Sequence, residues 1–232
     1  TVDHKKIGIL YFGAGFFFFV LAGIEALLIR IQLMYPLNDF VSAQTFNELF
    51  TMHGTTMLFL AALPLFFGYM NYVIPLQIGA RDVAFPFLNA LGLWTFILGG
   101  VMLNVSWFLG GAPDGGWTGY PTLSTINLAH QGMDFYSIGL QIAGIGTLVG
   151  AINFLATIIN MRAPGMSFMR MPLFTWATFI TSALILFAFT ALAINLIFMT
   201  FDRLFGANFF NVANGGNPVL WQHIFWIFGH PE

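Results

Sequence analysis

The sequence has 232 residues, of which 58% are hydrophobic and only 7% are charged, and its formal net charge is −2. A soluble domain carries about a quarter charged residues, so this composition excludes a soluble globule and a disordered chain. It also excludes a nucleic-acid-binding protein, because the chain has no basic run to meet phosphates. The chain has no cysteine, so a bound metal must use histidine, carboxylate or thioether ligands.

Long stretches without Asp, Glu, Lys or Arg recur along the chain, and each could hold a membrane-spanning helix of roughly 20 residues. We therefore predict an all-α, polytopic membrane helical bundle of about six spans, with no linker that separates two domains. In chain order, the spans are expected near residues 8–33, 50–76, 87–109, 136–160, 173–200 and from about 219 onward.

The last of these spans is predicted to be truncated. Residues 219–232 rise about 21 Å as a helix, which is less than the roughly 30 Å of a hydrocarbon core. Together with the start at Thr1, this indicates a piece of a longer membrane protein. The segment Gly110–Gln131 is too rich in Gly, Thr, Asn and Pro to be a further span, and we expect a surface loop there.

The charged residues between the spans predict an orientation. If the spans alternate, one side of the membrane carries acidic residues and only two basic residues, Arg30 and Arg203. The other side carries most of the basic residues. These basic residues are Lys5, Lys6, Arg81, Arg162 and Arg170. Because basic loops stay inside, we expect a multi-pass protein of the cell membrane with a cytoplasmic N-terminus.

Ionisable residues inside spans are rare and are usually functional. The histidine His53 could be an axial haem ligand, a copper ligand or a packed core residue. Arg30 could equally snorkel to the surface from its helix end. His223 and His230 share a helix face but lie about 10 Å apart along its axis, so at most one belongs to a given metal site. Glu25 and Glu232 complete this set.

Long strings of the sequence resemble subunit I of the haem–copper oxidases, in order and over essentially the whole chain. The strings are Met52–Thr55, Val73–Pro86, Gly116–Thr118 with Tyr120–Pro121, Asn153–Met161 and Trp221–Glu232. The chain is most similar to the proton-pumping class, including bacterial cytochrome c oxidases. Subunits of this family have about twice as many spans, so the resemblance implies that residues 1–232 are the N-terminal half of one transmembrane domain.

The resemblance implies a role for several residues. His53 matches an axial ligand of the low-spin haem, and His230 matches the first of three histidines that hold the copper facing a high-spin haem. Arg30 matches the arginine that hydrogen-bonds the formyl group of the low-spin haem, which would be of the haem A type. Trp117 matches a tryptophan that meets a haem propionate, although an interfacial aromatic residue would look the same. His223 matches no ligand, and we interpret it as structural.

The implied function is that of a terminal respiratory oxidase, which reduces oxygen to water with electrons from cytochrome c and pumps protons. The fragment itself is expected to be inactive alone. A subunit II with the electron-entry site, a subunit III and membrane lipid would be its partners. Quinol-oxidising relatives carry Arg, Asp, His and Gln at four positions that are Leu21, Glu25, Thr45 and Glu48 here. A quinol oxidase, a nitric oxide reductase relative and a non-catalytic truncated membrane protein remain the alternatives.

A proton route is the last prediction. The carboxylate Asp82 lies in an inner loop, and the asparagines Asn71, Asn89 and Asn153 each lie about 10–14 Å from that side by helical rise. Converging amides can order a file of water molecules, whereas the alternative is that they bond helices together. Glu232 would end the file near the copper ligand, where a desolvated carboxyl group is protonated and can donate its proton.

Overall fold

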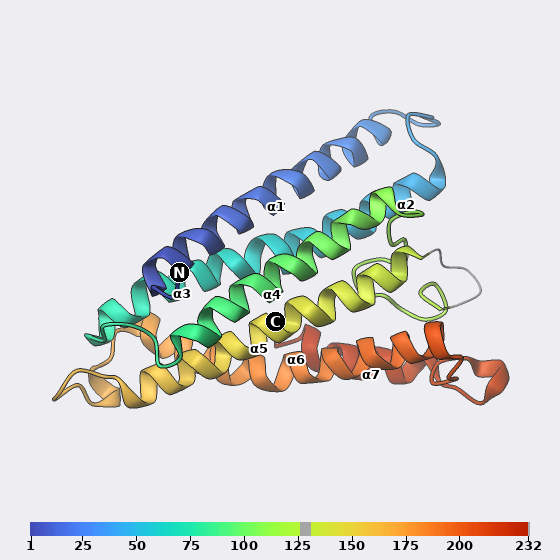
Figure 1. Ribbon diagram of the computed structural model, residues 1–232. Helices are drawn as coiled ribbons and strands as arrows, with labels where there is room; N and C mark the ends of the chain where they lie inside the picture. Colours follow the sequence, from blue (N-terminus) through green and yellow to red (C-terminus); the bar gives the residue numbers. More distant parts are fainter. Residues whose placement is uncertain (126–130, 232) are drawn as a thin grey trace.

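The computed structural model describes residues 1–125 and 131–231, and within these residues it contains helices and no strand. In this described part of the chain, five helical segments are long and apolar enough to cross a membrane. They are α1 (His4–Gln32), the run Ala43–Ile78, the run Pro86–Phe108, α5 (Gly132–Asn160) and α6 (Leu173–Phe205). The predicted all-α polytopic membrane bundle is confirmed, and the helices pack side by side along its length (Figure 1).

The second span is one continuous run of three helices: α2 (Ala43–Thr55), the π-helix η1 (Thr56–Ala62) and α3 (Leu63–Ile78). It starts seven residues before the predicted 50–76. The side chain of Ser42 accepts a hydrogen bond from the backbone N–H of Thr45 and starts the helix there, as a good N-cap does. The prediction missed these first turns because Glu48 interrupts the charge-free stretch that marks the apolar part.

The third span is α4 (Pro86–Val105), which continues as the short 3₁₀ helix η2 (Ser106–Phe108). Two further 3₁₀ turns, η3 (Phe168–Arg170) and η4 (Val212–Asn214), lie in connections. The final helix α7 (Pro218–Gly229) has 12 residues and is about 18 Å long, too short to cross the hydrocarbon core. This agrees with the predicted short last span.

Glycines allow the close helix contacts of the bundle. A Cβ atom on Gly99 in α4 would lie 2.4 Å from the carbonyl oxygen of Gly139 in α5, and one on Gly146 would lie 2.4 Å from that of Gly92. In α1, a Cβ on Gly8 would lie 2.8 Å from the Gly68 oxygen of α3. Small residues at such contacts are typical of membrane helices, whose backbones approach closely there.

The bundle has two ends. The N-terminal end carries the start of α1 and the α3–α4 and α5–α6 connections, while the far end carries the α1–α2, α4–α5 and α6–α7 connections (Figure 1). At the N-terminal end, Asp3 caps α1 by accepting hydrogen bonds from the backbone N–H groups of Lys5 and Lys6. The hydrogen bond from Lys6 is the main reason that the pKa of Asp3 lies below its ordinary value.

The α4–α5 connection at the far end differs in part from the predicted surface loop. Ala112 and Ser124 are completely buried, and Ala112 lies directly against Gly132 at the start of α5. Residues 126–130 lie outside the described part of the chain. The described part of this connection therefore folds down over the helix ends instead of standing out from them.

Candidate functional site

His53 lies at the end of α2 and is held by α1. Its Nδ1 atom lies 2.9 Å from the carbonyl oxygen of Ala22. A carbonyl only accepts, so Nδ1 carries the proton and donates, which leaves Nε2 as the atom with a free lone pair. Metal-ligating histidines are held in this way, with one ring nitrogen donating to a carbonyl and the other facing the metal. The half-buried ring is therefore oriented as an iron ligand requires.

The π-helix η1 begins three residues after His53. Thr56, the first residue of η1, and Thr55 before it are both fully buried. Neither hydroxyl group has a hydrogen-bond partner in the described part of the chain. In α-helices such hydroxyls commonly bond the carbonyl four residues earlier, and π-helical turns are frequent at functional sites. Thr56 follows His53 by three residues and shares its helix face, so its unpaired hydroxyl group fits a bound group next to His53, whereas Thr55 lies on the opposite face.

The α4–α5 connection places Trp117 beside the same turn of α2. A Cβ on Gly54 would lie 3.3 Å from Trp117 Cβ, which is a tight contact, so glycine lets Trp117 pack closely here. The backbone N–H of Gly116 donates to Thr51 Oγ1 at 2.9 Å, and the hydroxyl of Tyr136 donates to the carbonyl of Trp117 at 2.6 Å. The position of Trp117 relative to His53 is thus fixed by hydrogen bonds to α2 and α5.

An aromatic cluster closes the far end around Trp117. Its ring meets those of Phe225 and Trp226 of α7 at centroid distances of 5.5 and 6.1 Å. Trp221 donates its indole N–H to the carbonyl of Thr118 at 2.9 Å. The indole N–H of Trp117 itself has no acceptor among the described residues. A propionate carboxylate could fill that role.

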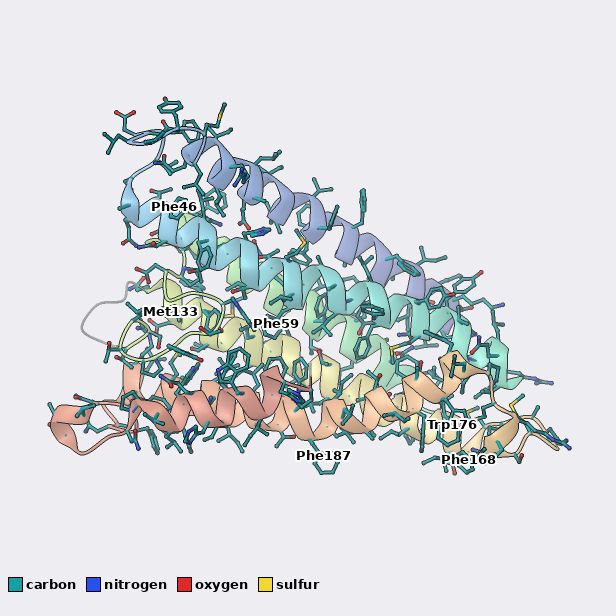
Figure 2. The ribbon with its side chains drawn as sticks, turned by 180° about the vertical axis from the view of Figure 1, so that it is seen from behind. Phe46, Phe59, Met133, Phe168, Trp176 and Phe187 are labelled. Carbon is teal, nitrogen blue, oxygen red and sulfur yellow. The ribbon has the colours of Figure 1, made fainter. Side chains whose placement is uncertain are left out.

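The second span also contacts α7 below this cluster. Phe59 of η1 stacks on Phe228 of α7 with ring centroids 5.7 Å apart, and Figure 2 shows Phe59 pointing into the bundle from the second span. Phe228 meets Phe189 of α6 edge-on at 5.1 Å. These rings keep the segment after His53 dry.

Arg30 stands apart from His53. It lies eight residues after Ala22 in α1, about 12 Å further along the helix. Its side chain is exposed and has no hydrogen-bond or ion-pair partner in residues 1–125 and 131–231. The structure thus leaves the guanidinium group available for an acceptor but does not bring it against the imidazole.

His223 on α7 and His230 just after it are both exposed. His230 lies directly after the last residue of α7 and has no side-chain partner among the described residues. The described residues contain no group of three His, Cys, Asp or Glu that could hold a metal ion. Glu232 lies outside the described residues. Of the predicted copper-site residues, the structure therefore describes His230 alone, and it does not bring further His, Asp or Glu side chains to it among the described residues.

The predicted asparagines are all buried near the N-terminal end, and two of them are paired. Asn89 Nδ2 donates to Asn71 Oδ1 at 2.6 Å, which joins α3 to α4. Asn153 of α5 instead bonds both backbone groups of Phe85, at 2.8 and 3.2 Å. Asp82 is half-buried in the α3–α4 connection, where its Oδ1 accepts from the backbone N–H of Val83 at 2.7 Å.

Three polar contacts were not predicted from the sequence. His4 is buried, and its Nδ1 donates to the carbonyl of Asn71 at 2.7 Å. Glu25 is buried, with one oxygen accepting from Trp107 Nε1 at 3.3 Å and the other without a partner in the described part. Arg203 forms an ion pair with Asp134 at 2.5 Å. The charged neighbours of His4 and the sequence separations of 67, 82 and 69 residues between the partners hid all three.

Comparison with known proteins settles the family. The family described as "Cytochrome C and Quinol oxidase polypeptide I" matches residues 6–232. The chain belongs to this family. It is 69% identical over 232 residues to cytochrome c oxidase subunit 1 of Bacillus sp. (strain PS3), covering 100% of this chain and 38% of the relative. The predicted resemblance to subunit I of the haem–copper oxidases is confirmed.

Other relatives in the family differ in the donor that their names state. Cytochrome c oxidase subunit 1 of Bacillus subtilis (strain 168) is 68% identical over 232 residues, which cover 100% of this chain and 37% of that relative. Quinol oxidase subunit 1 of the same strain is 50% identical over 233 residues, which cover 100% of this chain and 36% of that relative. The chain thus spans well under half the length of these relatives. The chain therefore belongs to an oxidoreductase family of multi-pass membrane proteins, whose members bind haem and copper.

Proposed function

We propose that this chain is the part of a terminal respiratory oxidase that carries the low-spin haem ligand, and that the complete enzyme reduces oxygen to water with electrons from cytochrome c while pumping protons. The observation that carries this proposal is the hydrogen bond from His53 Nδ1 to the Ala22 carbonyl. It directs Nε2 of a half-buried imidazole toward a ligand. Family membership supplies the oxidase chemistry.

The chain's own residues would hold a low-spin haem in distinct ways. His53 would give an axial nitrogen, the Trp117 indole N–H would meet a propionate, and Arg30 would hydrogen-bond the formyl group of a haem of the A type. The unpaired donors of Trp117 and Arg30 and the buried Thr56 hydroxyl group support this fit. When bound, such a haem supplies one-electron transfer at a potential set by its ligands and its dry surroundings.

The copper and the high-spin haem would make up the oxygen site in the complete subunit. His230 is one histidine of the copper's ligand set in this proposal. Its free, exposed ring at the end of α7 is accessible to such a metal. The remaining ligands must come from other parts of the enzyme, because the described residues hold no three-ligand group.

The polar residues at the N-terminal end support a proton route. Asp82 would take up protons at the α3–α4 connection, the paired Asn71 and Asn89 would hold water above it, and Glu232 would pass protons onward. Asn153 contributes by clamping the backbone of Phe85, three residues after Asp82. Asn153 and Asn71 each use one N–H and one oxygen lone pair in their bonds, Asn71 with Phe67 and Asn89. A second N–H and a second lone pair therefore remain on both amides for the water file.

Cytochrome c is the electron donor in this proposal, and quinol is the second candidate. The higher identity to cytochrome c oxidases, 69% against 50%, supports cytochrome c. So do the apolar Leu21, the Glu48 side chain, which is bonded to Gln44, and the Glu25 side chain, one oxygen of which is bonded to Trp107. Few free polar groups thus remain to clamp a quinone head group.

The complete enzyme would place this chain in a membrane beside other subunits. Subunit II with the electron-entry site, subunit III, oxygen and membrane lipid are the proposed partners. The N-terminus is proposed to be cytoplasmic, because Lys5, Lys6, Arg81, Arg162 and Arg170 all lie at the N-terminal end of the bundle and basic loops stay inside.

Oxygen uptake by the complete enzyme tests the proposed function. The purified oxidase is supplied either with reduced cytochrome c or with a reduced quinol, each able to deliver electrons at the same rate, and oxygen consumption is recorded. We expect uptake at least tenfold faster with cytochrome c. Faster uptake with the quinol would support the second candidate, and uptake with neither donor would contradict both.

A further inference from the structure

The connection between α1 and α2 is apolar and exposed, and nothing in the proposed oxidase chemistry uses it. Between residues 33 and 40 its only charged side chain is Asp39. The large apolar side chains are exposed to 54, 72, 61, 101 and 50% at Leu33, Met34, Tyr35, Leu37 and Phe40. An exposed apolar patch of this kind marks an interaction surface.

Hydrogen bonds give this loop a fixed shape. Gln32 at the end of α1 donates from Nε2 to the carbonyl of Asn38 at 2.5 Å and accepts at Oε1 from the backbone N–H of Val41 at 2.9 Å. Asn38 in turn donates from Nδ2 to the carbonyl of Ile31 at 2.7 Å. The polar groups of the loop thus pair with one another, and the apolar side chains are left on its outside.

Leu37 at the tip adopts a strained conformation. Its φ of 59° is the one positive φ at a non-glycine residue in the part of the chain that the structure describes. The left-handed region is unfavourable for an ordinary L-residue, and such strain persists where the surroundings enforce it, here through the hydrogen bonds of Gln32 and Asn38. The strained backbone thus lies at the most exposed of the loop's apolar side chains, which indicates that the outward position of this leucine is functional.

The length of α1 places this loop at a membrane surface. Lys6 and Leu33 are separated by a rise of about 40 Å, which matches the roughly 40–45 Å of a bilayer with its headgroups. With the two lysines in one headgroup layer, the loop lies in the other, and a tilted helix draws it deeper. The exposed apolar face of α1 runs without interruption up to the loop, through Phe17, Ile24, Leu27 and Ile31.

We propose that residues 33–40 form a membrane-interface anchor that inserts Met34, Tyr35 and Leu37 into the leaflet at the far end of the bundle. The partner is the lipid bilayer itself, reached by continuation of the lipid-facing side of α1. Since Asp39 is its only charge, the anchor binds by burying apolar area and not by attraction to anionic headgroups. Phe46 lies at the same end, near the base of the loop (Figure 2), and lines a hollow of about 430 Å³ between the loop and α2.

Spin-label depth measurements on the complete oxidase in lipid nanodiscs test the anchor. A nitroxide is attached at Leu37→Cys, and its collisions with oxygen and with a water-soluble nickel chelate are compared. A label in the leaflet meets oxygen more often than nickel. The matched control is Ala213→Cys, an exposed position on the polar α6–α7 connection at the same end, where nickel should dominate.

We expect the Leu37 label to show at least a threefold higher oxygen-to-nickel ratio than the Ala213 label, and the same ratio in neutral and in partly anionic nanodiscs. Equal ratios at the two positions would overturn the anchor. Low collision rates with both reagents at Leu37 would also overturn it, because they would show a protein subunit covering the loop. A ratio that depends on anionic lipid would contradict the apolar mode of binding.

Discussion

At the scale of single residues, the contact between His53 and Ala22 connects structure with chemistry. The Ala22 carbonyl lies inside α1, so accepting a second hydrogen bond from His53 ties the first span to the second at that level. The same bond fixes the tautomer of the imidazole. One hydrogen bond therefore both packs two helices together and prepares a ligand atom.

The proton route leads to a residue-scale prediction. In the complete enzyme, Asp82→Asn and Glu232→Gln should each slow oxygen reduction by at least about tenfold, since positioned proton-transfer groups supply factors of 10² to 10⁴. Both variants should lose proton pumping, while the low-spin haem spectrum stays intact. Oxygen uptake and proton release are measured together in vesicles.

Asp39→Asn serves as the control for that experiment, because Asp39 is an exposed carboxylate in the α1–α2 connection at the opposite end of the bundle. It should pump like the unmodified enzyme. If the Asp82 and Glu232 variants kept the unmodified ratio of protons to electrons, a route between these two residues would not exist.

The paired asparagines give a second prediction at this scale. Asn89→Ala removes the donor to a fully buried Asn71 oxygen, which should destabilise the bundle by about 1–3 kcal/mol. Asn71→Ala should lower the free energy of unfolding by a similar amount. The double variant should lower it by clearly less than the sum of the two single losses, because both substitutions remove the same hydrogen bond. Thermal unfolding of the three variants measures this coupling. Strict additivity would contradict the pairing.

At the scale of helices, most boundaries could be predicted from the sequence and the internal details could not. Stretches without charge identified the spans, because charged side chains are costly in lipid. The start of the last span was predicted near residue 219, one residue from its start at Pro218. The π-helix Thr56–Ala62 has no signal of its own, because Thr, Met, Leu, Phe and Ala suit an α-helix equally well. The Asn153 clamp was missed for a different reason: depth along a helix does not say which partner an amide meets.

The glycine contacts between α4 and α5 support a prediction about these two helices. Gly99→Ala would put a methyl group 2.4 Å from a backbone oxygen and 2.5 Å from a backbone nitrogen, so the helices must separate. Overpacking of this kind costs about 1–3 kcal/mol. We expect Gly99→Ala to lower the unfolding temperature in calorimetry.

Gly13→Ala in α1 is the matched control, because a Cβ there meets nothing within 4 Å. Alanine is the better helix former by about 1 kcal/mol, so the unfolding temperature should stay the same or rise. Equal behaviour of the two variants would show that close backbone contact does not hold α4 against α5.

At the scale of the whole molecule, the two ends of the bundle have different characters. The N-terminal end gathers basic residues and the asparagines, and the far end gathers the aromatic cluster, the Arg203–Asp134 ion pair and the apolar loop. Phe187 on α6 points away from the bundle between these ends (Figure 2) and is 79% exposed. This distribution fits a bundle whose middle faces lipid and whose two ends face different compartments.

Cysteine labelling tests the proposed orientation. With an impermeant thiol reagent on intact cells, Leu123→Cys in the α4–α5 connection should react, whereas Met169→Cys between Arg162 and Arg170 should react only after permeabilisation. Both positions are well exposed, at 58 and 86%, so access to the compartment decides the result. Labelling of Met169→Cys in intact cells would reverse the orientation.

If His53 binds the low-spin haem as proposed, its replacement will change the visible absorption spectrum of the complete enzyme. His53→Ala is compared with His223→Ala, whose exposed ring has no assigned ligand role. The low-spin band should disappear or collapse in His53→Ala, since a methyl group cannot replace an axial ligand, and it should persist in His223→Ala. An intact low-spin band in His53→Ala would contradict the assignment.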